Sequence, residues 1–133
     1  MEKYMVGENE VFFRSSGIIH IILRGEQTAE IARSFQDNHE LALAKFGGPI
    51  DYLIDMNQAG KVTPKARRMV KDLALSMDTG KVAVFGAHSL AKFYANLVLS
   101  SFGRDNSRFF PTKEQAEDWL KTSAGKPAPK TVC

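Results

Sequence analysis

Polar side chains that could bind a ligand gather where three of the predicted strands end. In an open parallel sheet, ligands bind at the loops that follow the carboxyl ends of the strands. The candidate ligand- or partner-binding residues at these ends are Arg24, Asp55, Asn57, Gln58, Thr63, Lys65, His88 and Ser89. The set is polar enough to bind a ligand, but its residue types do not identify one.

Three of these residues, Asp55, His88 and Ser89, supply the residue types of a hydrolytic triad. His88 and Ser89 are sequence neighbours that open a predicted helix, where a serine is a natural N-cap. The Gly-x-Ser-x-Gly sequence that presents the nucleophile of many hydrolases is absent. We therefore predict no catalytic residue and a protein that is not an enzyme. A hydrolase is kept as a third hypothesis, which a long distance between Asp55 and His88 would exclude.

The sequence also lacks the usual patterns for cofactor or metal binding. Single glycines at positions 60 and 86 match neither common spacing of a phosphate-binding loop. No Cys/His cluster has the spacing of a zinc site. We expect His20 to be a packed or edge-facing histidine in an apolar strand, and His39 to lie at the boundary of a buried helix face. We predict no cofactor and no metal.

The elements that must position these side chains follow from hydrophobic patterns and capping residues. Apolar runs predict strands at 10–14, 18–23, 50–56, 82–85 and 108–110, with 4–6 as a further candidate. Helical spacing predicts helices at 28–46, 63–77, 90–102 and 112–120, with Thr28, Thr63 and Thr112 as N-caps. Residues 57–62 are expected to form a loop.

This order of elements, β–β–α–β–α–β–α–β–α, predicts an α/β fold. We expect a mainly parallel sheet of about five strands with an N-terminal antiparallel hairpin strand and four helices. Residues 1–122 are expected to form a single domain. The Gly, Pro and Ser content of residues 123–133 predicts a disordered tail.

The composition argues against several classes of partner. The 133-residue chain has a net charge of +3, to which Lys126 and Lys130 of the tail contribute, so we predict no nucleic-acid binding. No apolar run is long enough to span a bilayer, and the polar N-terminus does not resemble a signal peptide. The one cysteine, Cys133, cannot form an internal disulfide. We therefore expect a cytoplasmic protein without stable membrane insertion.

Three segments of the chain resemble the STAS or SpoIIAA-like family, whose prototype is the bacterial anti-anti-sigma factor. They are GIIHIILRGEQT, IDYLIDMNQAGKVTPKARRMV, and the stretch from KVAVFG through ANLVLSSFGRDNSRFFPTKEQAEDWL. The third segment resembles the stand-alone bacterial SpoIIAA-like branch, which is also likened to CRAL-TRIO lipid-transfer domains. The resemblance runs from about residue 17 to 120. It implies a SpoIIAA-like fold and a non-enzymatic regulatory or protein-interaction module.

The resemblance to the anti-anti-sigma factors also implies a phosphorylation site. In those proteins a partner kinase modifies a serine in an Asp-Ser-Ser/Thr-Gly pattern before the second long helix. The matching positions here are 61–64, so Thr63 is the candidate phosphosite, where the free N–H groups of the helix start would stabilise a phosphate. The acidic residue and the glycine are missing, and Pro64 removes one N–H donor. The leading interpretation of Thr63 is therefore a plain N-cap.

The helix predicted at 90–102 is apolar around most of its circumference, although a helix that rests on a sheet needs only one apolar stripe. Its polar residues, Lys92, Asn96 and Ser100, are four apart and form one narrow stripe. The candidate face for a dimer or an apolar ligand consists of Leu90, Phe93, Tyr94, Leu97, Val98 and Phe102. Three interpretations stay open: burial within the same chain, a homodimer interface, and the wall of a pocket for a lipid-like ligand.

Our first hypothesis is a homodimeric STAS/SpoIIAA-like module that acts through contacts with an unidentified partner protein. It requires a partner that binds the loop around residues 57–65, or a phosphate on Thr63. The alternative is a carrier of a small apolar or lipid-like ligand, which requires an apolar cavity beneath the helix at 90–102.

Overall fold

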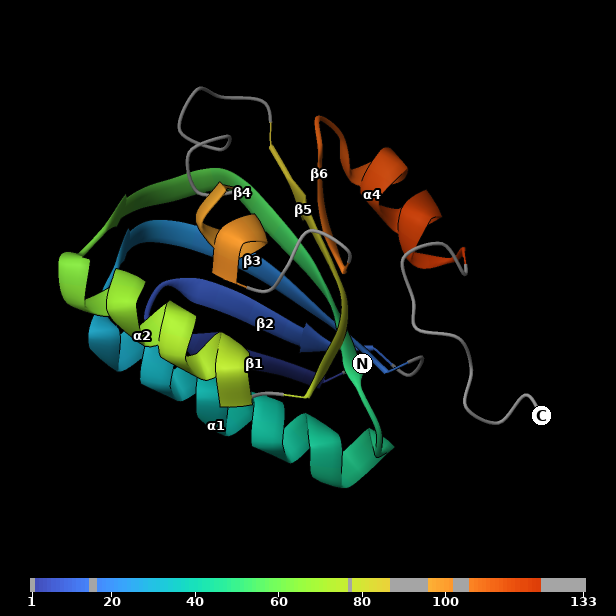
Figure 1. Cartoon of the computed structure of the whole chain (residues 1–133), viewed down its shortest axis with the longest axis horizontal. Coiled ribbons are helices and arrows are strands. Elements are labelled where there is room, and N and C mark those ends of the chain that lie inside the picture. Colours follow the sequence, from blue (N-terminus) through green and yellow to red (C-terminus); the bar gives the residue numbers. More distant parts are fainter. Residues whose placement is uncertain (1, 15–16, 77, 87–95, 102–105, 123–133) are drawn as a thin grey trace.

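The chain folds into a six-stranded sheet with helices on both faces (Figure 1). The computed structural model describes residues 2–14, 17–76, 78–86, 96–101 and 106–122. The strands are β1 (Glu2–Val6), β2 (Asn9–Phe13), β3 (Ile18–Gln27), β4 (Ile50–Val62), β5 (Thr79–Phe85) and β6 (Ser107–Phe110). The helices are α1 (Ala29–Phe46), α2 (Pro64–Ser76) and α4 (Lys113–Leu120), and residues 96–101 are also helical.

The strands lie side by side in the order in which they occur in the chain. β1, β2 and β3 pair antiparallel, whereas β3, β4, β5 and β6 pair parallel. Parallel neighbours need crossover connections. The helices α1 and α2 supply two of them and pack against each other over one face, while α4 covers the other face (Figure 1). The predicted α/β fold class is confirmed, and β1 adds a sixth strand to the expected five.

Threonines begin the helices α1, α2 and α4, as the sequence predicts. Each hydroxyl oxygen accepts a hydrogen bond from the backbone N–H three residues later: Thr28 from Ile31 at 3.3 Å, Thr63 from Ala66 at 3.1 Å and Thr112 from Gln115 at 3.3 Å. The helix α1 ends at Gly47, whose φ of 72° is a conformation that glycine adopts without strain. These helix ends are therefore set by local sequence.

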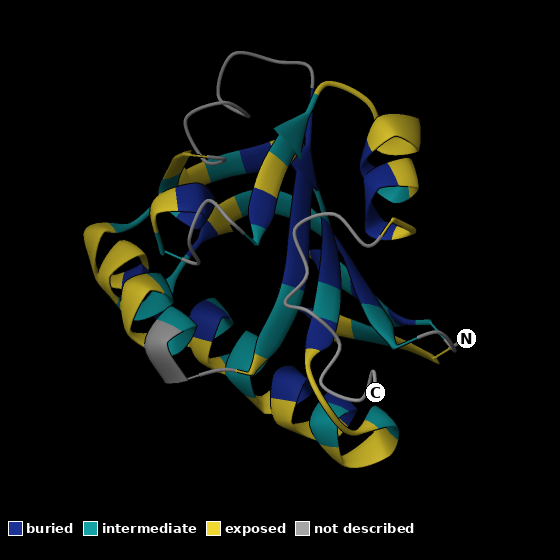
Figure 2. Ribbon diagram, turned by 45° about the vertical axis from the view of Figure 1, so that its right-hand side comes forward, coloured by how far each residue is buried: buried dark blue, intermediate teal, exposed yellow. Residues whose placement is uncertain are grey.

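Each face of the sheet carries its own hydrophobic core. Alternate residues of β4 serve the two cores, because Tyr52 and Met56 face α1 and α2 while Leu53 faces α4. The residues from Lys81 to Phe85 of β5 are buried without a break, as expected for a strand covered on both sides. Figure 2 shows these buried strands between helices whose outer surfaces are exposed.

The strands β3 and β4 are longer than the sequence predicts. The prediction of a loop at 57–62 is wrong, because these residues belong to β4 and pair with the end of β3 through Arg24, Gly25 and Gln27. Two register irregularities interrupt this part of the ladder, so the end of β4 lacks a regular alternation. A Cβ at Gly60 would lie 2.9 Å from the carbonyl carbon of Gly25. This glycine therefore serves a close approach of two strands and not a turn.

Candidate functional site

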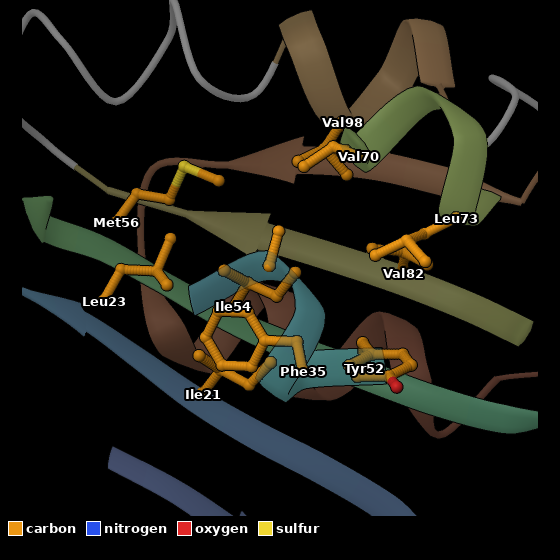
Figure 3. A pocket seen from close by; sticks show the side chains of 11 residues that line it. Ile21, Leu23, Phe35, Tyr52, Ile54, Met56, Val70, Leu73, Val82 and Val98 are labelled. Atoms are coloured by element: carbon orange, nitrogen blue, oxygen red, sulfur yellow. The ribbon is translucent and has the colours of Figure 1, made fainter. Parts of the chain in front are cut away.

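A cavity of about 130 Å³ lies between the sheet and the helices α1 and α2 (Figure 3). Its walls come from β3, β4, β5, α1, α2 and the helical residues 96–101. The described residues that line it are Ile21, Leu23, Ala32, Phe35, Tyr52, Ile54, Met56, Val70, Leu73, Val82 and Val98. Figure 3 shows their side chains converging from strands and helices on one space.

Local periodicity explains why these side chains share one space. Tyr52, Ile54 and Met56 alternate along β4, so all three point toward the helices. Val70 and Leu73 are three residues apart and therefore lie on the same face of α2. Because α2 packs against α1, its inner face stands over the strands with the cavity between them.

The described residues expose no polar atom to the cavity. Among the described lining residues, the one polar side-chain group is the hydroxyl of Tyr52, which lies 2.6 Å from Nδ1 of His39 in α1. Burial raises the pKa of Tyr52, and burial lowers the pKa of His39, so both side chains are neutral near pH 7. The prediction that His39 lies at a helix boundary is wrong: it is 1% exposed. The Tyr52 hydroxyl gives Nδ1 of the buried His39 a hydrogen-bond partner, which lowers the free-energy cost of burying the ring.

A second cavity, of about 90 Å³, adjoins the first near the N-terminal ends of α1 and α2. It is lined by Leu23, Gln27, Thr28, Ile31, Ala32, Phe35, Met56, Ala59, Val62, Ala66, Val70, Leu97 and Val98. The two cavities share Leu23, Ala32, Phe35, Met56, Val70 and Val98. The described lining again exposes no polar atom, although Gln27 and Thr28 belong to it.

The predicted polar residues lie elsewhere, and the structure brings four of them together in pairs. Arg24 Nε donates to Oε1 of Gln58 at 3.1 Å, and the backbone and side-chain amides of Asn57 donate to Asp55 at 2.9 and 3.1 Å. The Arg24 guanidinium also forms an ion pair with Glu10. Thr63 and Lys65 lie at the start of α2. None of these six predicted residues lines either cavity.

Several predicted site residues lie outside the described residues: His88, Ser89, Leu90, Phe93, Tyr94 and Phe102. The prediction that Asp55, His88 and Ser89 form no catalytic triad therefore stays a prediction. Of the predicted apolar face, the structure describes Leu97 and Val98. Val98 lines both cavities and Leu97 lines the second, so this part of the face points toward the sheet.

His20 lies on the opposite face of the sheet and is packed, as the sequence predicts. Nη2 of Arg14 lies 3.2 Å from His20 Nδ1 and donates to Glu117 of α4 at 3.0 Å. Burial, followed by the charge of Arg14, lowers the pKa of His20 to about 4, so the ring is neutral at pH 7. Among the described residues, no group of three or more His, Cys, Asp or Glu side chains is arranged to hold a metal ion.

A family model described as SpoIIAA-like matches residues 18–121, most of the chain. The chain belongs to the SpoIIAA-like family. Its solved structural relatives include an uncharacterized protein from the DUF3478 family with a SpoIIAA-like fold from Shewanella loihica PV-4. That protein is 24% identical, with a TM-score of 0.67 over 90% of this chain and 98% of the other.

The structure of the anti-sigma factor antagonist SpoIIAA in its unphosphorylated form is also similar to that of this SpoIIAA-like protein. It is 10% identical, with a TM-score of 0.55 over 85% of this chain and 97% of the other. Both likenesses establish the fold and leave the site to be argued from its own residues. No curated protein matches this chain. No helix among the described residues is long and apolar enough to cross a membrane.

The sequence offered an apolar cavity beneath residues 90–102 as one alternative, and Leu97 and Val98 line the cavities, but it did not predict that α1 and α2 supply other walls. A hydrophobic pattern reports which way a side chain points, but it does not report how far away the opposite wall lies. The available signal was the pair Ala32 and Ala66, two small residues on the buried faces of neighbouring helices, 5% and 1% exposed. Small residues leave space wherever the backbones do not approach closely.

Proposed function

We propose that this chain is a non-enzymatic SpoIIAA-like module that binds a small apolar ligand between the sheet and the helices α1 and α2. The observation that supports it is the pair of adjoining cavities, whose described lining exposes no polar atom. Ligand pockets are typically apolar and concave, and they lie where helices meet a sheet or one another. The sequence favoured a protein-interaction module over a carrier of an apolar ligand. Because of the cavities, we now favour ligand binding.

The energetics of the larger cavity favour a ligand. Side chains that line an empty apolar space lack packing partners on that side, so they lose dispersion contacts. Water replaces few of these contacts, because an apolar wall offers a water molecule no hydrogen-bond partners. An apolar ligand that contacts these walls gains the missing dispersion contacts as binding free energy.

Titration of the full-length chain with benzene, followed in backbone NMR spectra, tests this proposal. A cavity of about 150 Å³ in another protein binds benzene, so the probe suits this volume. We expect shift changes grouped around Ile54, Val70 and Val82. The variant Ala32→Leu places a larger side chain in the shared part of the two cavities, and we expect it to weaken binding at least tenfold.

The control variant is Ala44→Leu, which adds the same atoms on an exposed position of α1 and is expected to bind benzene as the natural chain does. Spectra of the natural chain that stay unchanged up to the solubility limit of benzene would contradict the proposal. Loss of binding in both variants would show that the added atoms, and not their position, cause the effect.

A second candidate function, regulation through a partner protein, is favoured by the position of Thr63. Its hydroxyl begins α2 beside the exposed Lys61 and Lys65, whose charges would stabilise a phosphate there. We expect Thr63→Glu to change the affinity for such a partner, with Thr63→Ser as the control. An identical set of proteins retained by both variants in a pull-down would count against this function.

The homodimer, the cytoplasmic location and the division into a domain at 1–122 and a tail at 123–133 stay predictions. Native mass spectrometry of the full-length chain reads the subunit number and any bound ligand together. A dimer mass would support the predicted assembly, and a monomer mass would exclude it.

A further inference from the structure

We infer that the two cavities form one elongated site for a single unbranched hydrocarbon chain, with the polar end of the ligand at the N-terminal ends of α1 and α2. This inference rests on the proposed function and adds the shape and direction of the ligand. The acyl chain of a free fatty acid and that of a lipid share this chemistry.

The shape follows from how the two cavities overlap. The six residues that line both cavities form a shared middle section, and each cavity has an end lined by residues of its own. Tyr52, Leu73 and Val82 line only the first cavity, whereas Thr28 and Ala66 line only the second. By comparison with a benzene-sized cavity of about 150 Å³, about 130 Å³ and about 90 Å³ together hold about eight to ten carbons in a row. A flexible chain adapts to two adjoining spaces of this size more easily than a rigid polycyclic ligand does.

The hydrocarbon character follows from the state of the polar groups around the cavities. The side-chain amide of Gln27 donates to the carbonyl oxygens of Arg24 and Gly25 at 3.1 and 2.9 Å, and its oxygen accepts from Asn9 at 2.9 Å. The Tyr52 hydroxyl is engaged with His39. Neither group exposes a polar atom to the cavities, so a polar group of the ligand placed there would lose its hydrogen bonds to water without replacement.

The direction follows from the difference between the two ends. The first cavity ends against Tyr52 and Val82, which are 6% and 1% exposed and belong to the sheet core. The second cavity ends at half-buried Thr28 and Val62, next to exposed Lys61. Of the two described linings, only that of the second cavity includes Gln27 and Thr28, so a polar head group fits better at this end, where the helix starts also favour negative charge.

Isothermal titration of the full-length chain with saturated fatty acids of six to fourteen carbons tests the shape. We expect the affinity to rise about fourfold for each added methylene up to about ten carbons and then to level off. Adamantane carboxylate, a rigid acid of similar carbon number, is expected to bind at least tenfold more weakly than decanoate. A lysophospholipid with a ten-carbon chain, titrated in parallel, shows whether a free acid or a lipid is the better source of the chain.

Two variants test the direction. Val82→Ile shortens the inner end by about one carbon, so decanoate should lose about fourfold in affinity while hexanoate is unchanged. Ala66→Leu narrows the outer end and should weaken both acids. Ala44→Leu, on the exposed side of α1, should leave both unchanged.

The outcomes separate this inference from the proposed function. If benzene binds but adamantane carboxylate binds as tightly as decanoate, the unbranched chain is excluded and an apolar site remains. If Ala66→Leu weakens decanoate alone while Val82→Ile weakens both acids, the direction is reversed. If neither benzene nor any acid binds, the proposed function and this inference fail together.

Discussion

The two faces of the sheet carry helices that are packed in different ways. On the α4 face, the ring of Trp119 fills the space over β5 and β6. Two cations lie over the ring, with Lys81 Nζ 4.8 Å and Arg108 Cζ 5.5 Å from the ring centre. On the face of α1 and α2, a cavity of about 130 Å³ separates the helices from β3, β4 and β5.

A buried anchor explains why the α4 face closes. Lys81 is completely buried, and its ammonium donates to the carbonyl oxygen of Trp119 at 2.7 Å and to the hydroxyl and carbonyl oxygens of Thr122. These acceptors lie at the C-terminal end of α4, where a positive charge is also favoured by the helix dipole. By contrast, α2 presents Ala66, Val70 and Leu73 to the cavities. Among the described residues, one aromatic ring and one anchored helix end fill the space over the strands on the α4 face, whereas the face of α1 and α2 keeps a cavity although Phe35 and Tyr52 line it.

The largest expected effect is that of Trp119→Ala. Removal of a buried indole should lower the free energy of unfolding by about 4 kcal/mol, because the α4 face cannot refill the space. Phe35→Ala on the cavity face should lower it by only about 2 kcal/mol, since Phe35 is half-buried beside a cavity. Urea denaturation of both variants measures the difference. Equal losses would show that the two faces are packed alike.

A pair of alanine substitutions should have opposite signs on the two faces. Ala116 of α4 is completely buried, so Ala116→Leu overpacks that face and should reduce stability by about 2 kcal/mol. Ala32→Leu adds the same atoms beside the cavities and should raise stability by about 1 kcal/mol. Thermal unfolding of the two variants checks the signs. A destabilised Ala32→Leu variant would mean that the cavity walls do not accept added atoms.

The smallest expected effect is a pH dependence that originates on the α4 face. Burial, with the charge of Arg14, lowers the pKa of His20 from 6.5 to about 4, so the unfolded chain binds the extra proton between these values. This contribution to stability is complete above about pH 6.5 and is lost as the pH falls toward 4. With allowance for solvent screening, it amounts to about 1 kcal/mol between pH 7 and 5.

Denaturation of the natural chain and of His20→Gln at pH 7 and at pH 5 isolates this contribution. The carboxylates and His39 are present in both proteins, so their titration affects both alike. The natural chain should lose more stability than the variant on acidification. Equal losses of stability in the two proteins would mean that folding does not change the pKa of His20.

Much of the fold could be predicted because its signals are local. The caps Thr28, Thr63 and Thr112 act on backbone groups three residues away, so a short stretch of sequence contains the whole interaction. The alternation of Tyr52, Ile54 and Met56 is likewise a local signal, because successive side chains of a strand point to opposite faces. The candidate site was predicted less well. Its apolar character was expected from residues 90–102, of which the structure describes only a part, and the polar loop residues do not line the cavities.

By itself, the sequence determined the order of the elements, the inward faces of the helices and the membership of an α/β fold, because each depends on the periodicity of a single element. Only the tertiary structure decided the length of β4, the burial of His39 and the existence of the cavities. Each of these depends on a second element far away in the chain: β3 as a ladder partner, Tyr52 as a hydrogen-bond partner, and the distance from α2 to the sheet. No pattern within one element contains these distances, because they are set by how whole elements pack.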